Sequence, residues 1–256
     1  MIVEARGLSV HYGDVTAVDG IDLTVTPGTL LALVGPNGSG KSSLVKAIAG
    51  VVRAEGSLQF GGRPHRPGTV AFMAQDIGGQ AALSVLEVVL LGRLRRLGLS
   101  ISSGDTAAVG AVMDELDLTH LAGRHLGELS GGQRQMVFLA QALASDPQVL
   151  LLDEPISALD LRHQLDVLDL VQRHTKTRGL ATVCVLHDLT AAARIADRVA
   201  MLRRGRLVAE GPSARILTAD LLADVFEVEA EILTTRAGLP VVSPTRTRSR
   251  SDPSSQ

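Results

Sequence analysis

One short segment limits the possible folds of this 256-residue chain more than any other. Residues 35–42 read Gly-Pro-Asn-Gly-Ser-Gly-Lys-Ser and match the phosphate-binding pattern G-x-x-x-x-G-K-[ST]. The apolar run 29–34 before it predicts a strand buried on both faces, and residues 42–50 after it predict a helix that ends at a glycine. Such a turn points its backbone N–H groups at phosphate oxygens. We therefore expect Lys41 to reach the β- and γ-phosphates of a nucleoside triphosphate and Ser42 to ligate Mg²⁺.

A second motif supplies the acidic groups that this chemistry needs. Three leucines at 150–152 are followed directly by Asp153 and Glu154. A buried strand there brings Asp153 to the carboxyl edge of a parallel sheet, where it can hold Mg²⁺ through water. Glu154 is then placed to polarise an attacking water as a general base. Alone, such an acidic pair is often a helix cap, but together with residues 35–42 it indicates a P-loop nucleoside triphosphatase.

A third motif indicates which kind of triphosphatase this is. Residues 129–133 read Leu-Ser-Gly-Gly-Gln and precede an apolar helical face. Ser130 suits the N-cap position, and Gly131 and Gly132 leave the start of the helix bare, so a phosphate can approach its amides closely. One triphosphate hardly needs two such helix ends from one subunit. We therefore expect a head-to-tail homodimer in which each Ser130 loop caps the γ-phosphate held by the partner's phosphate-binding loop.

The order of the remaining elements predicts the fold class. Strand patterns fill residues 2–34, and after residue 148 strand and helix patterns alternate, which is typical of a mainly parallel sheet covered by helices. We expect an α/β fold with a P-loop (RecA-like) core, an antiparallel β subdomain and an inserted α-helical lobe over 76–147. The ATP-binding domain is expected to span 1–243. Residues 244–256, rich in Ser, Thr, Pro and Arg, are expected to form a disordered tail.

Composition excludes several other function classes. Aromatic residues make up only 2% of the chain, too few for a caged carbohydrate site or a base-stacking platform. The formal net charge of -2 gives no basic excess for nucleic acid. A single cysteine, Cys184, cannot form an internal disulfide or a multi-thiolate metal site. No apolar run approaches the ~20 residues of a membrane-spanning helix.

The three motifs together resemble those of the ATP-binding subunits of ABC transporters, over residues 1 to about 240. Residues 129–133 match the signature motif of that family at every position. The resemblance implies that Tyr12 stacks on adenine and that Gln75 senses Mg²⁺ and meets a membrane subunit. It also implies that the loop ending at Asp160 crosses to the partner subunit and that His187 contacts the γ-phosphate. Each of these four could instead be an ordinary turn, strand-end or capping residue.

The expected site combines these assignments, with ATP and Mg²⁺ as the ligands. Catalysis is assigned to Glu154, His187 and Lys41, and the metal to Ser42, Gln75 and Asp153. The residues expected to bind ATP are Tyr12, Gly35, Pro36, Asn37, Gly38, Ser39, Gly40, Lys41, Ser42, Ser43, Gln75, Ser130, Gly131, Gly132, Gln133 and Asp160.

Three segments outside the core motifs make the chain resemble one group of importers in particular. Residues 85–93, 157–168 and 205–212 are similar to those of importers of ferric siderophores, haem and cobalamin. That group implies a peripheral subunit on the cytoplasmic face of the membrane, bound to polytopic permease subunits and, through them, to a solute-binding protein. An exporter subunit and a non-transport ATPase of the cluster-assembly type share the core motifs and remain alternatives. The sequence departs from the family at Gln141, where arginine is usual.

Overall fold

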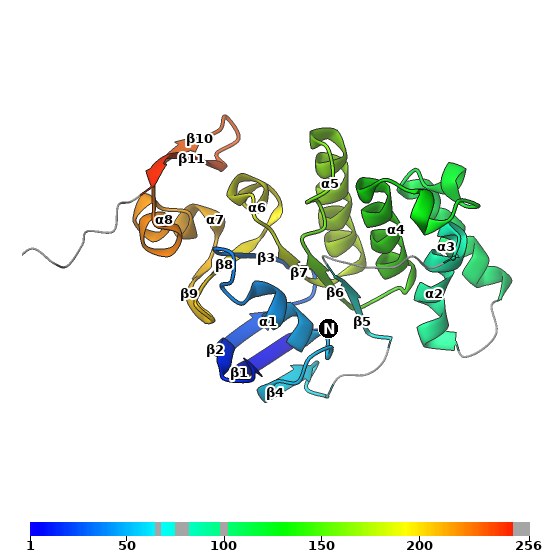
Figure 1. Ribbon diagram of the computed structural model, residues 1–256, viewed down its shortest axis with the longest axis horizontal. Helices are drawn as coiled ribbons and strands as arrows, with labels where there is room; N and C mark the ends of the chain where they lie inside the picture. Colours follow the sequence, from blue (N-terminus) through cyan, green and yellow to red (C-terminus); the bar gives the residue numbers. More distant parts are fainter. Residues whose placement is uncertain (65–67, 75–81, 98–101, 248–256) are drawn as a thin grey trace, which may run out of the picture.

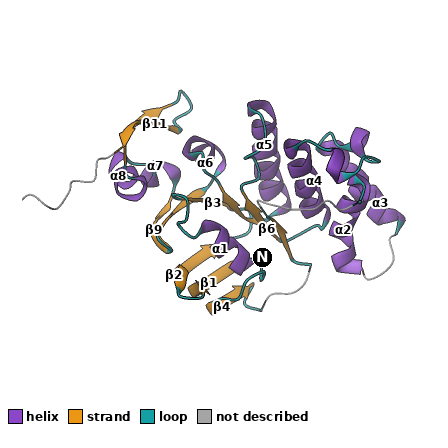
Figure 2. Ribbon diagram, viewed as in Figure 1, coloured by secondary structure: helices purple, strands orange, loops and turns teal. Residues whose placement is uncertain are grey.

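The computed structural model describes residues 1–64, 68–74, 82–97 and 102–247. Helices gather at one end of the molecule, two sheets lie in its middle, and a β-hairpin lies at the other end (Figure 1). From residue 148 onward strands alternate with helices (Figure 2), as the sequence predicts for a parallel sheet.

The central sheet positions the ends of its strands at one edge. It has six strands in the order β5-β6-β7-β3-β8-β9, and all neighbouring pairs are parallel except β8 and β9. Because the strands are ordered differently in the sheet and in the sequence, strands that are distant in the sequence end side by side. The strands are β3 (Leu30–Val34), β5 (Val70–Met73), β6 (Val149–Asp153), β7 (Ala181–Val185), β8 (Arg198–Arg203) and β9 (Arg206–Gly211).

Both faces of this sheet are buried, which explains its unbroken apolar runs. Every residue of β3, β6 and β7 is buried. Alternate residues of one strand enter different cores: Leu31 packs into the core beneath the sheet, while Ala32 packs into the core that the other helices cover. A buried polar side chain needs a partner there, so these strands are almost entirely apolar; Thr182 of β7 is an exception, and its hydroxyl hydrogen-bonds that of Thr175 at 2.7 Å.

A second sheet and the first helix close the lower core. The antiparallel sheet has the order β2-β1-β4, formed by β1 (Val3–Tyr12), β2 (Val15–Val25) and β4 (Glu55–Phe60). Helix α1 (Lys41–Ile48) contacts strands of both sheets and buries Leu44, Val45 and Ile48 between them. This packing holds the first residue of α1, and so the phosphate-binding loop before it, in a fixed place.

The helices between β5 and β6 form a lobe beside the central sheet. Helices α2 and α4 make the closest pair in this lobe, because Gly92 of α2 lies against Gln141 of α4. A Cβ atom at Gly92 would lie 2.2 Å from the carbonyl oxygen of Gln141, so only glycine allows this approach. The elements of the lobe are α2 (Val85–Leu97), α3 (Ser103–Glu115), η1 (Thr119–Leu121), η2 (Leu126–Glu128) and α4 (Gly131–Ala144).

Four helices and a hairpin complete the described part of the chain. Helix α5 (Leu161–Arg178) and α6 (Leu189–Ile195) lie between the last parallel strands, followed by α7 (Ser213–Ile216) and α8 (Ala219–Phe226). The antiparallel pair β10 (Val228–Thr234) and β11 (Pro240–Thr247) ends the described chain.

The structure differs from the sequence prediction at the start of the tail. Residues 244–247 were expected to be disordered, but they continue β11, where Arg246 forms an ion pair with Glu229 at 2.6 Å. Pairing with β10 stabilises a segment whose composition alone indicates disorder, and the register shift at Ala230 accommodates Pro244. Residues 248–256 lie outside the described residues.

Candidate functional site

The largest group of predicted site residues meets in one cleft of about 600 Å³. The cleft lies at the carboxyl edge of the central sheet, where β3, β6 and β7 end. It is lined by Tyr12, Ala17, Asn37, Gly38, Ser39, Gly40, Lys41, Ser42, Ser43, Glu154 and His187. We call it the first cleft.

Backbone geometry in the loop 35–42 requires glycine at two positions. Gly35 has φ 152° and Gly40 has φ 102°, in the range that other residues rarely adopt. A Cβ atom at Gly35 would lie 2.2 Å from the carbonyl oxygen of Leu202, and one at Gly40 would lie 2.3 Å from that of Ala17. The loop is therefore packed against β8 and β2, and it delivers free N–H groups to the start of α1.

Lys41 is the first residue of α1 and is almost fully buried. Its Nζ atom donates to the carbonyl oxygens of Gly35 at 2.8 Å and Pro36 at 3.0 Å, so the ammonium group lies across the loop. Burial lowers the pKa of Lys41, and the carboxylates of Glu154 and Asp153 partly offset that effect. The loop thus holds a positive charge that an anion can share.

Asp153 and Ser42 form a pair suited to a hard cation. The hydroxyl of Ser42 donates to Oδ1 of Asp153 at 3.0 Å. Asp153 is 1% exposed, and its Oδ2 has no hydrogen-bond partner among the described residues. Burial raises the pKa of Asp153, and the hydrogen bond from Ser42 and the charges of Lys46 and Lys41 offset that effect only in part. A divalent cation bound by oxygen ligands would supply that compensation, so the donor set fits Mg²⁺.

Glu154 faces the same cleft from the end of β6. Its backbone has φ 56°, an unusual left-handed conformation for a residue with a long side chain. A carboxylate oxygen of Glu154 hydrogen-bonds Nε2 of His187, which follows β7. The side chain of His187 is 45% exposed, while that of Glu154 is 9% exposed. The pair therefore joins a sheltered carboxylate to an imidazole that a ligand can reach.

Tyr12 lies at the outer end of the first cleft, at the turn between β1 and β2. The residue is 48% exposed, an unusual position for an aromatic ring unless something covers it. An exposed ring beside a phosphate-binding loop is suited to stack on a flat base.

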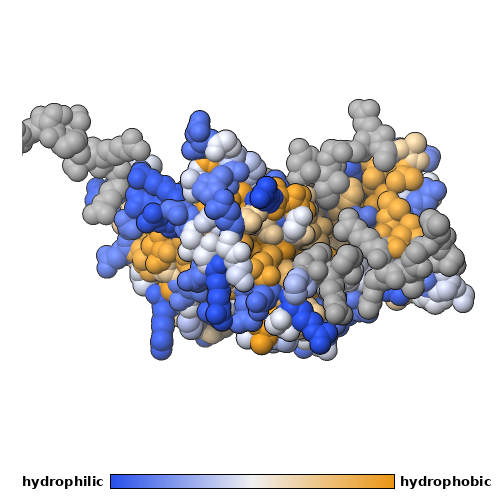
Figure 3. All heavy atoms as spheres, turned by 90° about the horizontal axis from the view of Figure 1, so that it is seen from below, coloured by the Kyte–Doolittle hydropathy of each residue, from blue (hydrophilic) through white to orange (hydrophobic). Residues whose placement is uncertain are grey.

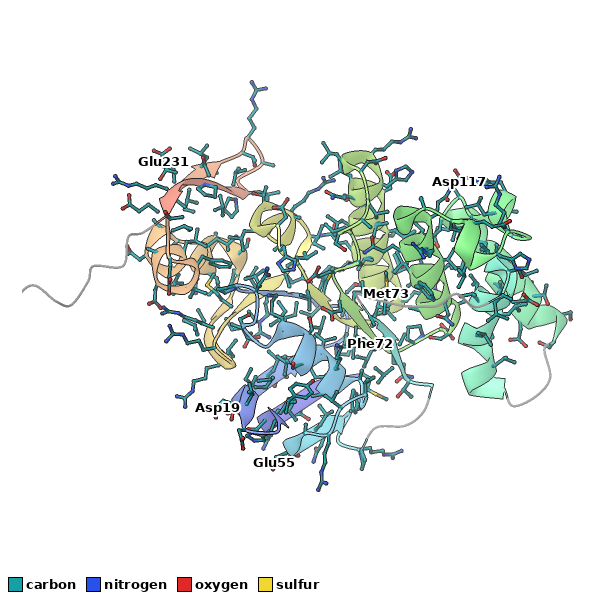
Figure 4. The ribbon with its side chains drawn as sticks, viewed as in Figure 1. Asp19, Glu55, Phe72, Met73, Asp117 and Glu231 are labelled. Atoms are coloured by element: carbon teal, nitrogen blue, oxygen red, sulfur yellow. The ribbon has the colours of Figure 1, made fainter. Side chains whose placement is uncertain are left out.

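A second cleft, of about 510 Å³, gathers another group of predicted residues. Its lining includes Ser130, Gly131, Gly132 and Gln133 at the start of α4, and Asp160 before α5. Figure 4 shows Asp117, which also lines this cleft, on the helical lobe and far from Asp19 on β2. The two clefts share no lining residue, so the two helix ends that the sequence predicts to bind phosphate lie in different clefts of the molecule.

The start of α4 has the geometry expected of an N-cap. The Ser130 hydroxyl accepts a hydrogen bond from the Gln133 amide at 3.2 Å, and Oε1 of Gln133 accepts one from the Ser130 amide at 3.0 Å. Because the hydroxyl accepts in this bond, its own hydrogen can be donated to a ligand. Gln133 is thus partly engaged in capping the helix. Asp160 likewise caps α5 by accepting from the amide of His163 at 3.0 Å.

Two further observations complete the site. Gln75, predicted to sense the metal, lies outside the described residues. Gln135, which the sequence analysis missed, is buried and binds the backbone around Glu154: Nε2 donates to the Glu154 carbonyl oxygen at 2.6 Å. The signal is weak, because α4 also carries Gln133, Arg134 and Gln141, and only the structure shows that Gln135 lies among the buried residues of the helix.

Comparison with protein families places these residues in a known context. Residues 18–157 match the family model described as ABC transporter. The chain is 42% identical over 255 residues to the hemin import ATP-binding protein HmuV of Streptomyces coelicolor, covering 96% of this chain and 91% of that one. It is 35% identical over 237 residues to the iron(3+)-hydroxamate import ATP-binding protein FhuC of Bacillus subtilis, covering 89% and 88%.

Solved structures agree with these sequence matches. An inward-facing ABC transporter described as of the metal-chelate type has a subunit that is 29% identical to this chain, with a TM-score of 0.82 over 95% of this chain and 97% of that one. An ATP-binding cassette of an ABC transporter in its ADP conformation has a TM-score of 0.76 at 24% identity, covering 88% and 98%. The second likeness concerns the fold alone.

Proposed function

The chain belongs to the ABC transporter family, and from this premise we propose that it is the ATP-hydrolysing subunit of an importer of haem or a ferric hydroxamate-type chelate. The observation that carries the proposal is the first cleft, where Lys41, the Ser42–Asp153 pair and the Glu154–His187 pair converge. The class of cargo is supported by relatives that are named for hemin and iron(3+)-hydroxamate import.

The first cleft would bind ATP along its length. Tyr12 would stack on the adenine, and the N–H groups before α1 would bind the phosphates. Lys41 would turn from the Gly35 and Pro36 carbonyl oxygens toward the phosphate oxygens. Ser42 and Asp153 would hold Mg²⁺, which, when bound, offsets the negative charge of the phosphates.

Glu154 and His187 would carry out the proton chemistry. The Glu154 carboxylate accepts the proton of a water molecule as the water oxygen attacks the γ-phosphorus and the bond to the bridging oxygen breaks. The partial exposure of His187 allows its ring to contact the γ-phosphate while it orients the Glu154 carboxylate. This role is supported by the sheltered position of the carboxylate, since a base exposed to bulk water would orient a single water poorly.

The second cleft would bind the nucleotide of a second copy of the chain. The bare start of α4 is a phosphate site, and the first cleft of the same chain does not use it. A symmetric head-to-tail dimer places each Ser130 opposite the Lys41 loop of the other copy, so ATP binding would close the dimer. Hydrolysis would reopen it.

The helical lobe is the surface we assign to the permease subunits. Apolar side chains are exposed on the part of the molecule that holds α2 (Figure 3), and Leu91 of that helix is 39% exposed. No helix in the described ranges is long and apolar enough to cross a bilayer. Attachment to the cytoplasmic face through membrane subunits, with a solute-binding protein on the opposite side, agrees with both observations.

The importer is favoured over the two alternatives that share its motifs. An exporter subunit or a cluster-assembly ATPase would have the same two clefts. The two relatives described above match over most of their length and are named for import, and the metal-chelate type transporter is similar over 95% of this chain.

A gene deletion and a pull-down test the proposal. Cells that lack this chain should lose uptake of labelled haem or ferric hydroxamate; the wild-type gene should restore it, and the Glu154→Gln variant should not. The tagged chain should recover a polytopic membrane protein from detergent-solubilised membranes. Unchanged uptake of both chelates, or recovery of soluble partners alone, would contradict the importer assignment.

A further inference from the structure

Gln135 is a buried polar residue that the chemistry of the first cleft does not yet use. It lies in the second turn of α4, and only 8% of its surface is exposed. Its side chain crosses from α4 to the turn that follows β6. Nε2 donates to the Glu154 carbonyl oxygen at 2.6 Å, and Oε1 accepts from the Ala158 amide at 3.1 Å. The side-chain amide therefore spans the turn from Glu154 to Ala158 and fixes both its ends.

The turn needs such a clamp because Glu154 has an unfavourable backbone conformation. A non-glycine residue in the left-handed region persists only where its surroundings impose it. The Glu154 carbonyl oxygen accepts from Nε2 of Gln135 at 2.6 Å, a shorter distance than those to the Ser157 hydroxyl at 3.2 Å and the Ser157 amide at 3.4 Å. Rotation of Glu154 out of this conformation would move its carboxylate away from His187 and out of the first cleft.

We propose that Gln135 is a positioning residue that holds Glu154 in its left-handed conformation and so aims the Glu154 carboxylate into the first cleft. Gln135 touches neither nucleotide nor water in this account and acts only through Glu154. The inference rests on the proposed function, because it assumes that Glu154 is the base for ATP hydrolysis.

The position of Gln135 also joins the two clefts. The same helix begins at Ser130 in the second cleft, and its first turn packs on the Ala158–Leu159 segment. A Cβ atom at Gly132 would lie 3.0 Å from the Ala158 carbonyl oxygen, which shows how closely the helix and the turn fit. A displacement of α4 by a ligand at Ser130 would therefore reach Glu154 through Gln135.

Replacement of Gln135 by leucine separates this role from nucleotide binding. Leucine has a similar volume and removes the hydrogen bonds to the Glu154 carbonyl oxygen and from the Ala158 amide, and also the one that Nε2 donates to the Ser157 hydroxyl at 3.3 Å. We expect the full-length Gln135→Leu variant to lose roughly 10- to 100-fold in kcat, as small displacements of a catalytic group do. The KM for ATP should stay within about twofold, because Tyr12 and Lys41 lie on other elements.

A matched control tests the loss of a comparable hydrogen bond elsewhere. Nε2 of Gln172 in α5 donates to the Ile195 carbonyl oxygen at 2.9 Å, away from both clefts. Gln172→Leu should leave kcat unchanged. Equal kcat values for Gln135→Leu and Gln172→Leu, beside an active wild-type chain, would overturn the inference. A wild-type chain without ATPase activity would instead count against the proposed function.

A second variant gives a readout that packing alone would not change. In Gln135→Glu, the ionised side chain cannot donate to the Glu154 carbonyl oxygen, whereas the protonated side chain can. We expect the ratio of its kcat to the wild-type kcat to rise as pH falls from about 8 to about 6. Asp153, Glu154, His187 and Lys41 are present in both proteins, so the ratio cancels their effects to first order. A flat or falling ratio would contradict the positioning role.

Discussion

The replacement Gly131→Ala tests whether the start of α4 is a phosphate site without disturbing the fold. Gly131 is the first residue of α4 and lines the second cleft. A Cβ atom there would lie 3.7 Å from Cβ of Ala158, an ordinary contact. One at Gly132 would lie 3.0 Å from the Ala158 carbonyl oxygen and 3.1 Å from Cδ2 of Leu159, so these neighbours would have to shift by a few tenths of an ångström. Alanine therefore fits at position 131 without movement, whereas at 132 it requires a local shift.

The two effects of Gly131→Ala have opposite directions. Without nucleotide, alanine in a helix raises the free energy of unfolding by up to about 0.5–1 kcal/mol relative to glycine. With ATP, the methyl group obstructs the approach of a phosphate to the helix N–H groups, and losing one such charged hydrogen bond costs about 1.5–3 kcal/mol. A symmetric dimer contains the change twice, so dimerisation should weaken by about 3–6 kcal/mol, roughly 10²- to 10⁴-fold.

Two measurements check this prediction. Denaturant unfolding without nucleotide should show Gly131→Ala at least as stable as the parent, and Gly132→Ala less stable than Gly131→Ala. Sedimentation velocity in a Glu154→Gln background, with ATP and Mg²⁺, should show a dimer for the parent and mainly monomer for Gly131→Ala. An equally tight dimer would refute the assignment of this helix end to the partner's phosphate.

Three further predictions concern the phosphate-binding loop, the end of β6 and helix α5. Gly40→Ala should destabilise the chain by about 3 kcal/mol or more, because its Cβ would lie 2.3 Å from the backbone oxygen of Ala17. Gly38→Ala has open space around its Cβ and should lower the stability by only about 1 kcal/mol. Thermal melting of the two variants measures the difference. Asp153→Asn should abolish Mg²⁺-dependent turnover. It should also raise the free energy of unfolding at pH 7 by about 1 kcal/mol, because folding raises the pKa of this carboxyl and its charged form therefore costs stability above that pKa. Burial lowers the pKa of His174 in spite of the Glu115 carboxylate beside it, so protonating this ring costs more in the folded chain than in the unfolded chain. The melting temperature should therefore fall from pH 7 to pH 5, less steeply in His174→Gln.

Much of the core could be predicted because a strand that is buried on both faces is built almost entirely from apolar residues. The runs at 30–34, 149–152 and 181–185 are apolar at almost every position, and each forms a central strand. Local motifs also fixed the start of α1 and the cap of α4, since both depend on neighbouring residues alone.

The remainder depends on contacts between distant segments. Residues 244–247 join a sheet only because β10 pairs with them, and composition does not contain that information. Gln135 and Glu154 are 19 residues apart, and the sequence of α4 does not show which group the Gln135 side chain hydrogen-bonds. The sequence predicts that Ser130 acts away from the Lys41 loop of its own chain, but the residues that line each cleft follow from the packing of the lobe against the sheet.

ATP turnover by Glu154→Gln tests the central claim most directly. The glutamine keeps the size of the side chain but cannot accept a proton from water, so the variant should bind ATP and form the dimer while releasing no phosphate above background. Tyr12 is the only tyrosine and the chain has no tryptophan, so its fluorescence reports binding in the same sample. ATP hydrolysis by this variant at the wild-type rate would contradict the role of Glu154 and, with it, the mechanism of the first cleft.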